Sequence, residues 1–203
     1  DYYGEQWAQT TPEDHWDRYF GDTGYTVANY YKELTMGKMT FVPAEFTKKA
    51  PNQTVQNGVL AVTLNRAHPT ASGDAAGTIL SIIRATDDYI DYAAYDTNKD
   101  GKCTQDELAI LILNSGPDRS STAQYYNSGS PKSYFAVHGT SQPTSLTIDG
   151  VLVVSGTSGG RVCNLGEYNK PGTIMPIGVP THELAHNFGG EDLYHRGGHA
   201  DAT

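Results

Sequence analysis

The sequence has few cysteines, few basic residues and no long hydrophobic run. Its two cysteines are too few for a disulfide-rich scaffold and allow at most one disulfide. Its 14 Lys and Arg face 23 Asp and Glu, and the net charge of −9 argues against nucleic acid and against an anionic membrane surface as partners. The longest apolar run, residues 108–113, is far too short to cross a bilayer, so we expect no membrane insertion.

The composition that is present is typical of an exported protein. Tyr, Gly, Thr, Ser and Asn are abundant and Lys is scarce, which favours a secreted, extracellular chain. Residues 1–30 contain no basic stretch followed by a hydrophobic one, so we expect no retained signal peptide. The 203 residues are enough to bury a core, and no internal repeat divides them. We therefore expect residues 1–203 to form a single domain.

Helical and extended patterns alternate along the chain, which predicts an α+β fold. Thr11 is a suitable N-cap and Pro12 a suitable first residue for a helix over residues 11–20. Two more helices are expected, one over residues 25–37 and a long one over residues 74–95. β-Branched and aromatic residues between Gly, Pro and Asn predict strands over residues 38–46, 58–65, 107–114, 133–139 and 151–156.

A short histidine motif, H-E-L-A-H at residues 182–186, is the strongest functional signal. With the 7 His of this chain, random placement would give the pattern H-E-x-x-H about 0.01 times. On a helix, His182 and His186 project from one face one turn apart and can share one zinc ion through neutral imidazole. Glu183 lies beside them and suits a general base that takes a proton from water. The alternative is a solvated amphipathic helix whose histidines bind nothing.

The residues that flank this motif bound the helix and supply candidates for a third zinc ligand. Pro180 and Thr181 suit the helix start, and Gly189 followed by another glycine suits its end. The extended pattern H-E-x-x-H-x-x-G-x-x-H puts Asp192 at the last position, where a carboxylate oxygen can bind zinc. An alternative role for Asp192 is to accept the free N–H of a ligating imidazole. His195 is the second candidate ligand, and His199 follows in a glycine-rich stretch.

A further histidine, His138, lies in the expected strand over residues 133–139. It is either a group that approaches the site to bind substrate or an ordinary strand histidine.

A second motif, D-T-N-K-D-G-K-C-T-Q-D-E at residues 96–107, matches the EF-hand loop pattern at every specified position. Calcium prefers six to eight oxygen ligands, and the loop offers them from Asp96, Asn98, Asp100, the Lys102 carbonyl, Thr104 and Glu107. Gly101 allows the sharp turn. A polar turn without metal is the alternative. The apolar residues that follow predict a strand, so we expect one structural helix–loop–strand calcium site.

The two cysteines are Cys103, at a loop position that normally points inward, and Cys163. We expect them to form a disulfide that restricts the unfolded chain, with two buried reduced thiols as the alternative. Neither lies in a sequence context typical of a catalytic nucleophile.

Three separated segments together resemble the immune inhibitor A family of secreted bacterial zinc metallopeptidases. They are V-A-N-Y-Y-K-E-L-T-M-G-K-M, Y-D-T-N-K-D-G-K-C-T-Q-D-E-L-A-I-L-I-L-N-S-G and H-E-L-A-H-N-F-G-G-E-D-L-Y, in the family's order. The resemblance implies a metzincin-like zinc protease domain with a mixed sheet, a long backing helix and a zinc-binding active-site helix. It also implies a zymogen that acts on protein or peptide substrates. Carried over from the family are His182 and His186 as zinc ligands, Glu183 as general base, and Asp96, Asn98, Asp100 and Glu107 as calcium ligands.

The chain departs from this family's pattern in two places. Gly190 and Glu191 replace the usual leucine and proline, which predicts a looser turn after the zinc helix. No methionine follows His186, although metzincin-like folds have a methionine-containing turn there. We therefore expect the domain to lack its C-terminal part, and its partners to include a pro-segment or the remainder of a larger protease.

Two functions are compatible with these motifs. The first is a secreted zinc-dependent endopeptidase that hydrolyses peptide bonds with zinc-activated water and a glutamate base. The second is a calcium-stabilised binding or scaffold module, derived from such a protease and catalytically inactive. Retention of Glu183 favours the enzyme, because loss of activity removes the reason to keep that carboxylate.

Overall fold

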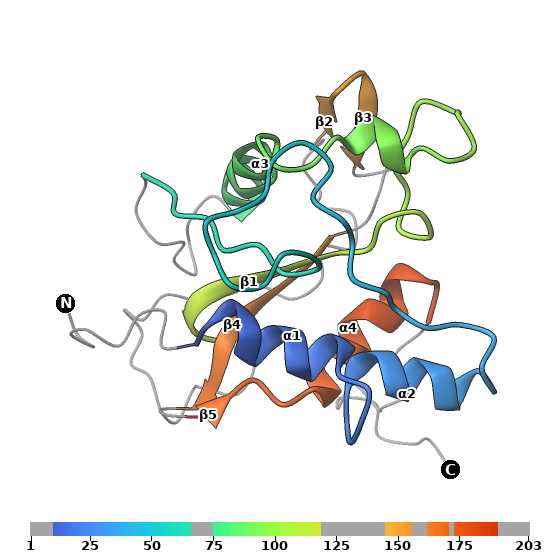
Figure 1. The fold of residues 1–203 in the computed structure, drawn as a ribbon, viewed down its shortest axis with the longest axis vertical. Helices are drawn as coiled ribbons and strands as arrows, with labels where there is room; N and C mark the ends of the chain where they lie inside the picture. The colour runs from blue at the N-terminus through green and yellow to red at the C-terminus, as the bar shows by residue number, and fades with distance from the viewer. Residues whose placement is uncertain (1–9, 66–74, 119–144, 156–161, 171–172, 191–203) are drawn as a thin grey trace, which may run out of the picture.

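A computed structural model of the chain describes residues 10–65, 75–118, 145–155, 162–170 and 173–190 (Figure 1). Its helices and strands, in chain order, are α1 (Pro12–Phe20), α2 (Val27–Leu34), α3 (Ala75–Thr86), the 3-10 helix η1 (Tyr92–Tyr95), β1 (Ile110–Pro117), β2 (Ser145–Ile148), β3 (Val151–Ser155), β4 (Val162–Lys170), β5 (Thr173–Ile174) and α4 (Gly178–Asn187). This confirms the predicted mixed α+β architecture. None of the described helices has the length and apolar character that crossing a bilayer requires.

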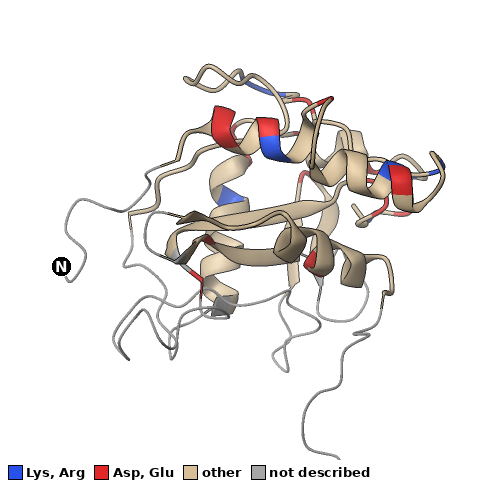
Figure 2. Ribbon diagram, turned by 90° about the horizontal axis from the view of Figure 1, so that it is seen from below, with Lys and Arg blue, Asp and Glu red and all other residues tan. Residues whose placement is uncertain are grey.

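The central sheet is mixed, as expected, and contains three strands in the order β1-β4-β5. β1 runs parallel to β4, and β5 runs antiparallel to β4. A separate hairpin joins β2 to β3 through Asp149 and Gly150, whose φ values of 52° and 84° suit the tight turns that hairpins favour. β1, β2 and β3 contain no charged residue, and Figure 2 shows the charged residues mainly on the surrounding helices and loops.

The two faces of the central sheet bury different core clusters. Neighbouring residues of a strand point to opposite faces, so Val162 and Cys163 of β4 enter different clusters. The first cluster joins the sheet to α3 and the β2–β3 hairpin and includes Ile83 and Val153. The second joins it to α2 and α4 and includes Leu184. Figure 1 shows the same layering, with α3 on one side of β1 and β4 and with α1, α2 and α4 on the other.

The helix ends follow the local signals in the sequence. Thr11 caps α1 with a reciprocal capping box, because its hydroxyl accepts the N–H of Asp14 and the Asp14 carboxylate accepts the N–H of Thr11. Thr26 caps α2 without a reciprocal bond, because its hydroxyl accepts the N–H of Asn29. α4 begins at Gly178, two residues before the expected start, and ends where predicted, with Gly189 at a φ of 87°.

Two predicted strands are absent from the described residues, and one predicted helix is shorter. Residues 38–46 contain only an isolated bridge, from Glu45 to Asn57, and residues 58–65 contain no strand. The Gln53 side chain bonds backbone groups of this segment, which removes partners from a strand ladder. The helix expected over residues 74–95 ends at Thr86, whose hydroxyl bonds Tyr92 of the separate helix η1. The expected strand over residues 133–139 lies outside the described residues.

Candidate metal centres

Helix α4 carries the H-E-x-x-H motif and is fixed by contacts on its buried side. Leu184 packs into the second core cluster with Val27 and Tyr31 of α2. The Tyr31 hydroxyl donates a buried hydrogen bond of 2.6 Å to the carbonyl oxygen of Thr181. These contacts hold the first turns of α4 against α2 and the sheet.

His182 and His186 face each other on the partly exposed side of α4. Their Nε2 atoms are 3.0 Å apart, and their rings cross at 84° with centroids 4.5 Å apart. Two imidazole nitrogens that bind one tetrahedral zinc at 2.0–2.1 Å lie about 3.4 Å apart. The separation of the two nitrogens therefore fits two ligands of a single zinc ion. The Nδ1 atom of His186 lies 2.7 Å from the carbonyl oxygen of Gly190.

Glu183 lies on the buried side of α4 and is only 6% exposed. It is close enough to β4 to act on Cys163, since burial, together with the Glu183 charge, raises the pKa of the Cys163 thiol to about 12. The Asn187 amide, one turn further along α4, donates a hydrogen bond of 3.1 Å to the same sulfur. Because residues four apart share one side of a helix, Glu183 lies with Asn187 on the side of α4 that faces β4.

The candidates for a third zinc ligand lie outside the residues that the structure describes. Asp192, His195 and His199 are outside the described residues, and so is His138. Among the residues that are described, no group of three His, Cys, Asp or Glu side chains is placed to hold a metal ion. α4 offers two candidate ligands, and a catalytic zinc needs three protein ligands.

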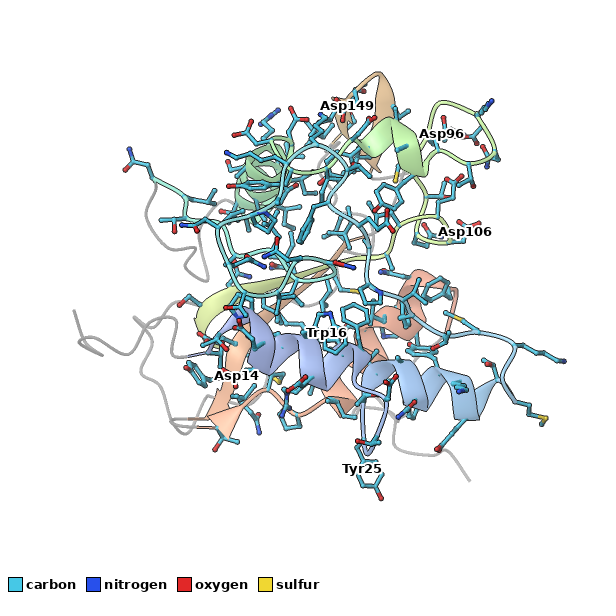
Figure 3. All side chains as sticks on the ribbon, viewed as in Figure 1. Asp14, Trp16, Tyr25, Asp96, Asp106 and Asp149 are labelled. Atoms are coloured by element: carbon cyan, nitrogen blue, oxygen red, sulfur yellow. The ribbon has the colours of Figure 1, made fainter. Side chains whose placement is uncertain are left out.

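The EF-hand-like loop is folded around its own carboxylates. Positive φ values at Lys99 and Gly101, of 61° and 81°, turn the chain sharply. The two Asp96 carboxylate oxygens accept the N–H groups of Asp100 and Gly101 at 3.0 and 2.9 Å. The side chain of Asn98 also accepts the Asp100 N–H, at 2.9 Å. In Figure 3, Asp96 and Asp106 mark the two ends of this loop, which lies well away from Asp14 of α1.

Glu107, the twelfth loop residue, closes the loop by reaching back to its start. Its Oε1 accepts the N–H of Thr97 at 2.8 Å, and its Oε2 accepts the N–H of Thr104 at 3.0 Å. Desolvation raises the pKa of Glu107, but the hydrogen bonds from Thr104, Thr97 and Asn98 outweigh it and lower the pKa to about 2. The loop thus presents carboxylate oxygens of the kind that calcium prefers, and within the loop Glu107 Oε1 accepts three hydrogen bonds and Oε2 accepts two.

The loop is coupled to strand β3. The Gly101 carbonyl accepts the Leu152 N–H at 2.9 Å, and the Leu152 carbonyl accepts the Cys103 N–H at 3.0 Å. A single 3-10 turn, η1, precedes the loop and β1 follows it. β3 thereby pairs with the position at which EF-hand loops usually pair with each other. The predicted strand follows the loop, but a four-residue 3-10 turn precedes it in place of the end of the expected long helix.

The predicted disulfide is absent from the structure. Cys103 and Cys163 are both free and buried. Cys103 belongs to the core cluster shared with α3, and Cys163 belongs to the cluster shared with α2 and α4. A disulfide needs Cα atoms within about 7 Å and Cβ atoms that point toward each other. The two thiols enter cores on opposite faces of the sheet, so the prediction of a Cys103–Cys163 bond was wrong.

Two buried carboxylates escaped the sequence analysis. Asp118 is 1% exposed and accepts the Gly166 N–H at 2.7 Å, while Glu167 is 3% exposed and accepts the Gly116 N–H at 3.3 Å. Each carboxylate thus bonds the backbone of the opposite strand, beside the register shift between β1 and β4. Single acidic residues in a strand give no periodic signal, which is why the sequence did not reveal them.

The chain matches no protein-family model, no curated protein and no solved structure. The geometry of the two motifs is therefore the basis for a functional assignment.

Proposed function

We propose that this chain is the catalytic domain of a secreted zinc-dependent endopeptidase of metzincin-like architecture, related to the immune inhibitor A family. The observation that carries the proposal is the pair of facing His182 and His186 Nε2 atoms, 3.0 Å apart, with the Glu183 carboxylate on the same helix. The sequence pattern that produces this arrangement would arise by chance only about 0.01 times in a chain of this composition.

The residues that hold zinc are His182 and His186, with Asp192 as third ligand and His195 as the second candidate for that position. When bound there, zinc supplies Lewis-acid chemistry, because it polarises a peptide carbonyl and lowers the pKa of water toward neutrality. Glu183 takes the proton from the attacking water and delivers it to the leaving amine. Glu183 is only 6% exposed, so little bulk water reaches its side chain.

The second part of the proposal is a structural calcium ion in the loop of residues 96–107. Its ligands are Asp96, Asn98, Asp100, the Lys102 carbonyl, Thr104 and Glu107. The loop connects η1 to β1 and pairs with β3. Calcium there stabilises the folded chain by mass action, because the unfolded loop binds it weakly.

The proposal is tested by zinc content and by cleavage of an unstructured protein such as casein. Wild-type protein is expected to hold about one zinc ion per chain and to cleave casein until a zinc chelator is added. Activity returns when zinc is restored. His182→Ala and His186→Ala lose the zinc and the activity, whereas His15→Gln, which removes a histidine from α1, keeps both.

A wild-type protein that binds no zinc, or that cleaves casein equally well with chelator present, contradicts the proposal. A zinc-free, inactive protein that calcium still stabilises would instead be a calcium-stabilised binding or scaffold module.

A further inference from the structure

We infer that the glycine turn after α4 is a positioning device for His186, in which the Gly190 carbonyl selects the tautomer whose Nε2 lone pair faces His182. The zinc role of that lone pair rests on the proposed function, but the choice of tautomer does not. Gly190 is therefore a positioning residue, because it acts on the candidate zinc site only by orienting the His186 ring.

The turn is a Schellman motif built on the last turn of α4. The Gly190 N–H donates to the Ala185 carbonyl at 2.9 Å, and the Gly189 N–H donates to the His186 carbonyl at 3.1 Å. Gly189 takes the left-handed conformation, with a φ of 87°, that this motif requires. The chain therefore folds back over α4 and brings its residue 190 beside His186.

Glycine at position 190 is required by space. A Cβ atom there would lie 3.0 Å from the Ala185 carbonyl oxygen and 3.2 Å from the Ala185 Cβ. Both neighbours belong to the helix and yield little, so a larger residue pushes the backbone at position 190 outward. The Gly190 carbonyl oxygen moves with it.

The contact between this oxygen and His186 decides where the ring proton sits. The distance from His186 Nδ1 to the Gly190 oxygen is 2.7 Å. A carbonyl oxygen only accepts hydrogen bonds, so Nδ1 must carry the hydrogen. In the neutral ring, Nε2 then carries the lone pair, and this atom lies 3.0 Å from His182 Nε2.

A metal ligand needs that lone pair on the side that faces the ion. Outer hydrogen bonds to ligating histidines fix the tautomer and ring orientation, and their loss typically costs about 10–100-fold in metal affinity. The hydrogen bond between His186 and Gly190 is exposed to solvent. We therefore expect its loss to weaken zinc binding by about tenfold, at the lower end of this range.

The test compares Gly190→Ala with Gly178→Ala in the full chain. Gly178 opens α4, and a Cβ there meets nothing within 4 Å, so its substitution controls for an added methyl group in the same helix. Nitrogen-15 NMR of histidine-labelled, metal-free protein at about pH 8, where ordinary histidine is neutral, reports the tautomer of His186. Zinc affinity is then measured by competition with a chelator, and melting temperature reports the fold.

In the wild-type and Gly178→Ala proteins, His186 is expected to be entirely in the Nδ1–H tautomer. Gly190→Ala is expected to show a mixture of both tautomers and about tenfold weaker zinc binding. An unchanged tautomer in folded Gly190→Ala overturns the inference. If wild-type protein binds no zinc, the proposed function fails while the tautomer comparison still decides this inference.

A second pair of variants keeps the test decisive if Gly190→Ala does not fold. Gly189→Asn retains a residue that tolerates the left-handed conformation, whereas Gly189→Ala disfavours it. The asparagine variant is expected to keep the wild-type tautomer and the alanine variant to lose it. The same tautomer in both variants overturns the inference.

Discussion

At the scale of single residues, a partly buried chain of hydrogen bonds fixes α1 to the sheet. His15 Nε2 lies 2.7 Å from the Thr10 hydroxyl, and that hydroxyl donates to the Glu167 carboxylate of β4. Burial lowers the pKa of His15, and the nearby positive charge of Arg18 lowers it further, whereas the charges of Glu167 and Asp14 oppose the shift. The folded protein therefore holds His15 in its neutral form more firmly than the unfolded chain does.

This shift predicts a pH dependence of stability. The pKa of His15 in the folded protein lies below its ordinary value of 6.5. The stabilisation that neutral His15 gives the folded protein is therefore complete above pH 6.5 and is lost as the pH falls through the folded pKa. His15→Gln keeps an N–H donor near the Nε2 position but cannot titrate. The denaturant midpoint of metal-free wild-type protein is expected to fall more between about pH 8 and pH 5 than that of His15→Gln. Equal falls for the two proteins would contradict this role of His15.

At the scale of elements, the sequence predicted best where the signals are local. The Thr11 cap, the glycine stop after α4 and the β-branched run of β1 all act within a few residues, and the structure has each of them. β4 was not predicted, because its sequence V-C-N-L-G-E-Y-N-K lacks a β-branched run. Its polar residues Asn164 and Glu167 are buried with partners on β1, as when the Asn114 amide donates to the Asn164 side chain at 2.6 Å.

The same distinction applies to the candidate sites. The spacing of His182 and His186 was enough to predict that their side chains meet, because helix geometry fixes it. The Gly190 carbonyl as a partner of His186 and β3 as a partner of the calcium loop depend on how the chain folds back, which spacing does not encode. The disulfide prediction failed for this reason too, since only the fold decides which face of the sheet each cysteine meets.

The calcium loop is the element whose proposed function is most directly testable by stability. Calcium added to metal-free wild-type protein is expected to raise the free energy of unfolding by about 2.7 kcal/mol at 100 times its Kd. Glu107→Gln should remove most of this gain, because Glu107 closes the loop with both oxygens. Thermal melting of both proteins with and without calcium measures this gain in stability.

Asp106→Asn is the matched control for the calcium experiment. Asp106 is the exposed neighbour of Glu107 and its substitution removes the same charge, but it occupies no ligand position of the pattern. It is expected to keep the calcium response. A wild-type melting curve that does not change with calcium would contradict the assignment of the loop.

At the scale of the whole molecule, one sheet carries both candidate sites. The calcium loop leads into β1, β1 pairs with β4, and β4 packs through Cys163 against the second core cluster, to which α4 belongs (Figure 1). The sheet thus separates the calcium loop and α3 from α2 and α4. In this arrangement a rigid parallel strand pair supports the helix that carries the histidines, which suits a site that must hold its ligands in fixed positions.

The central claim is that Glu183 is the general base of a zinc peptidase, and its most direct test is peptide hydrolysis by Glu183→Gln at equal zinc content. Glu33→Gln, which changes an exposed glutamate of α2, is the matched control. We expect Glu183→Gln to bind zinc and melt like wild-type protein while kcat/KM falls at least about 100-fold, and we expect Glu33→Gln to remain active. Hydrolysis by zinc-loaded Glu183→Gln within about twofold of the wild-type rate would contradict the claim.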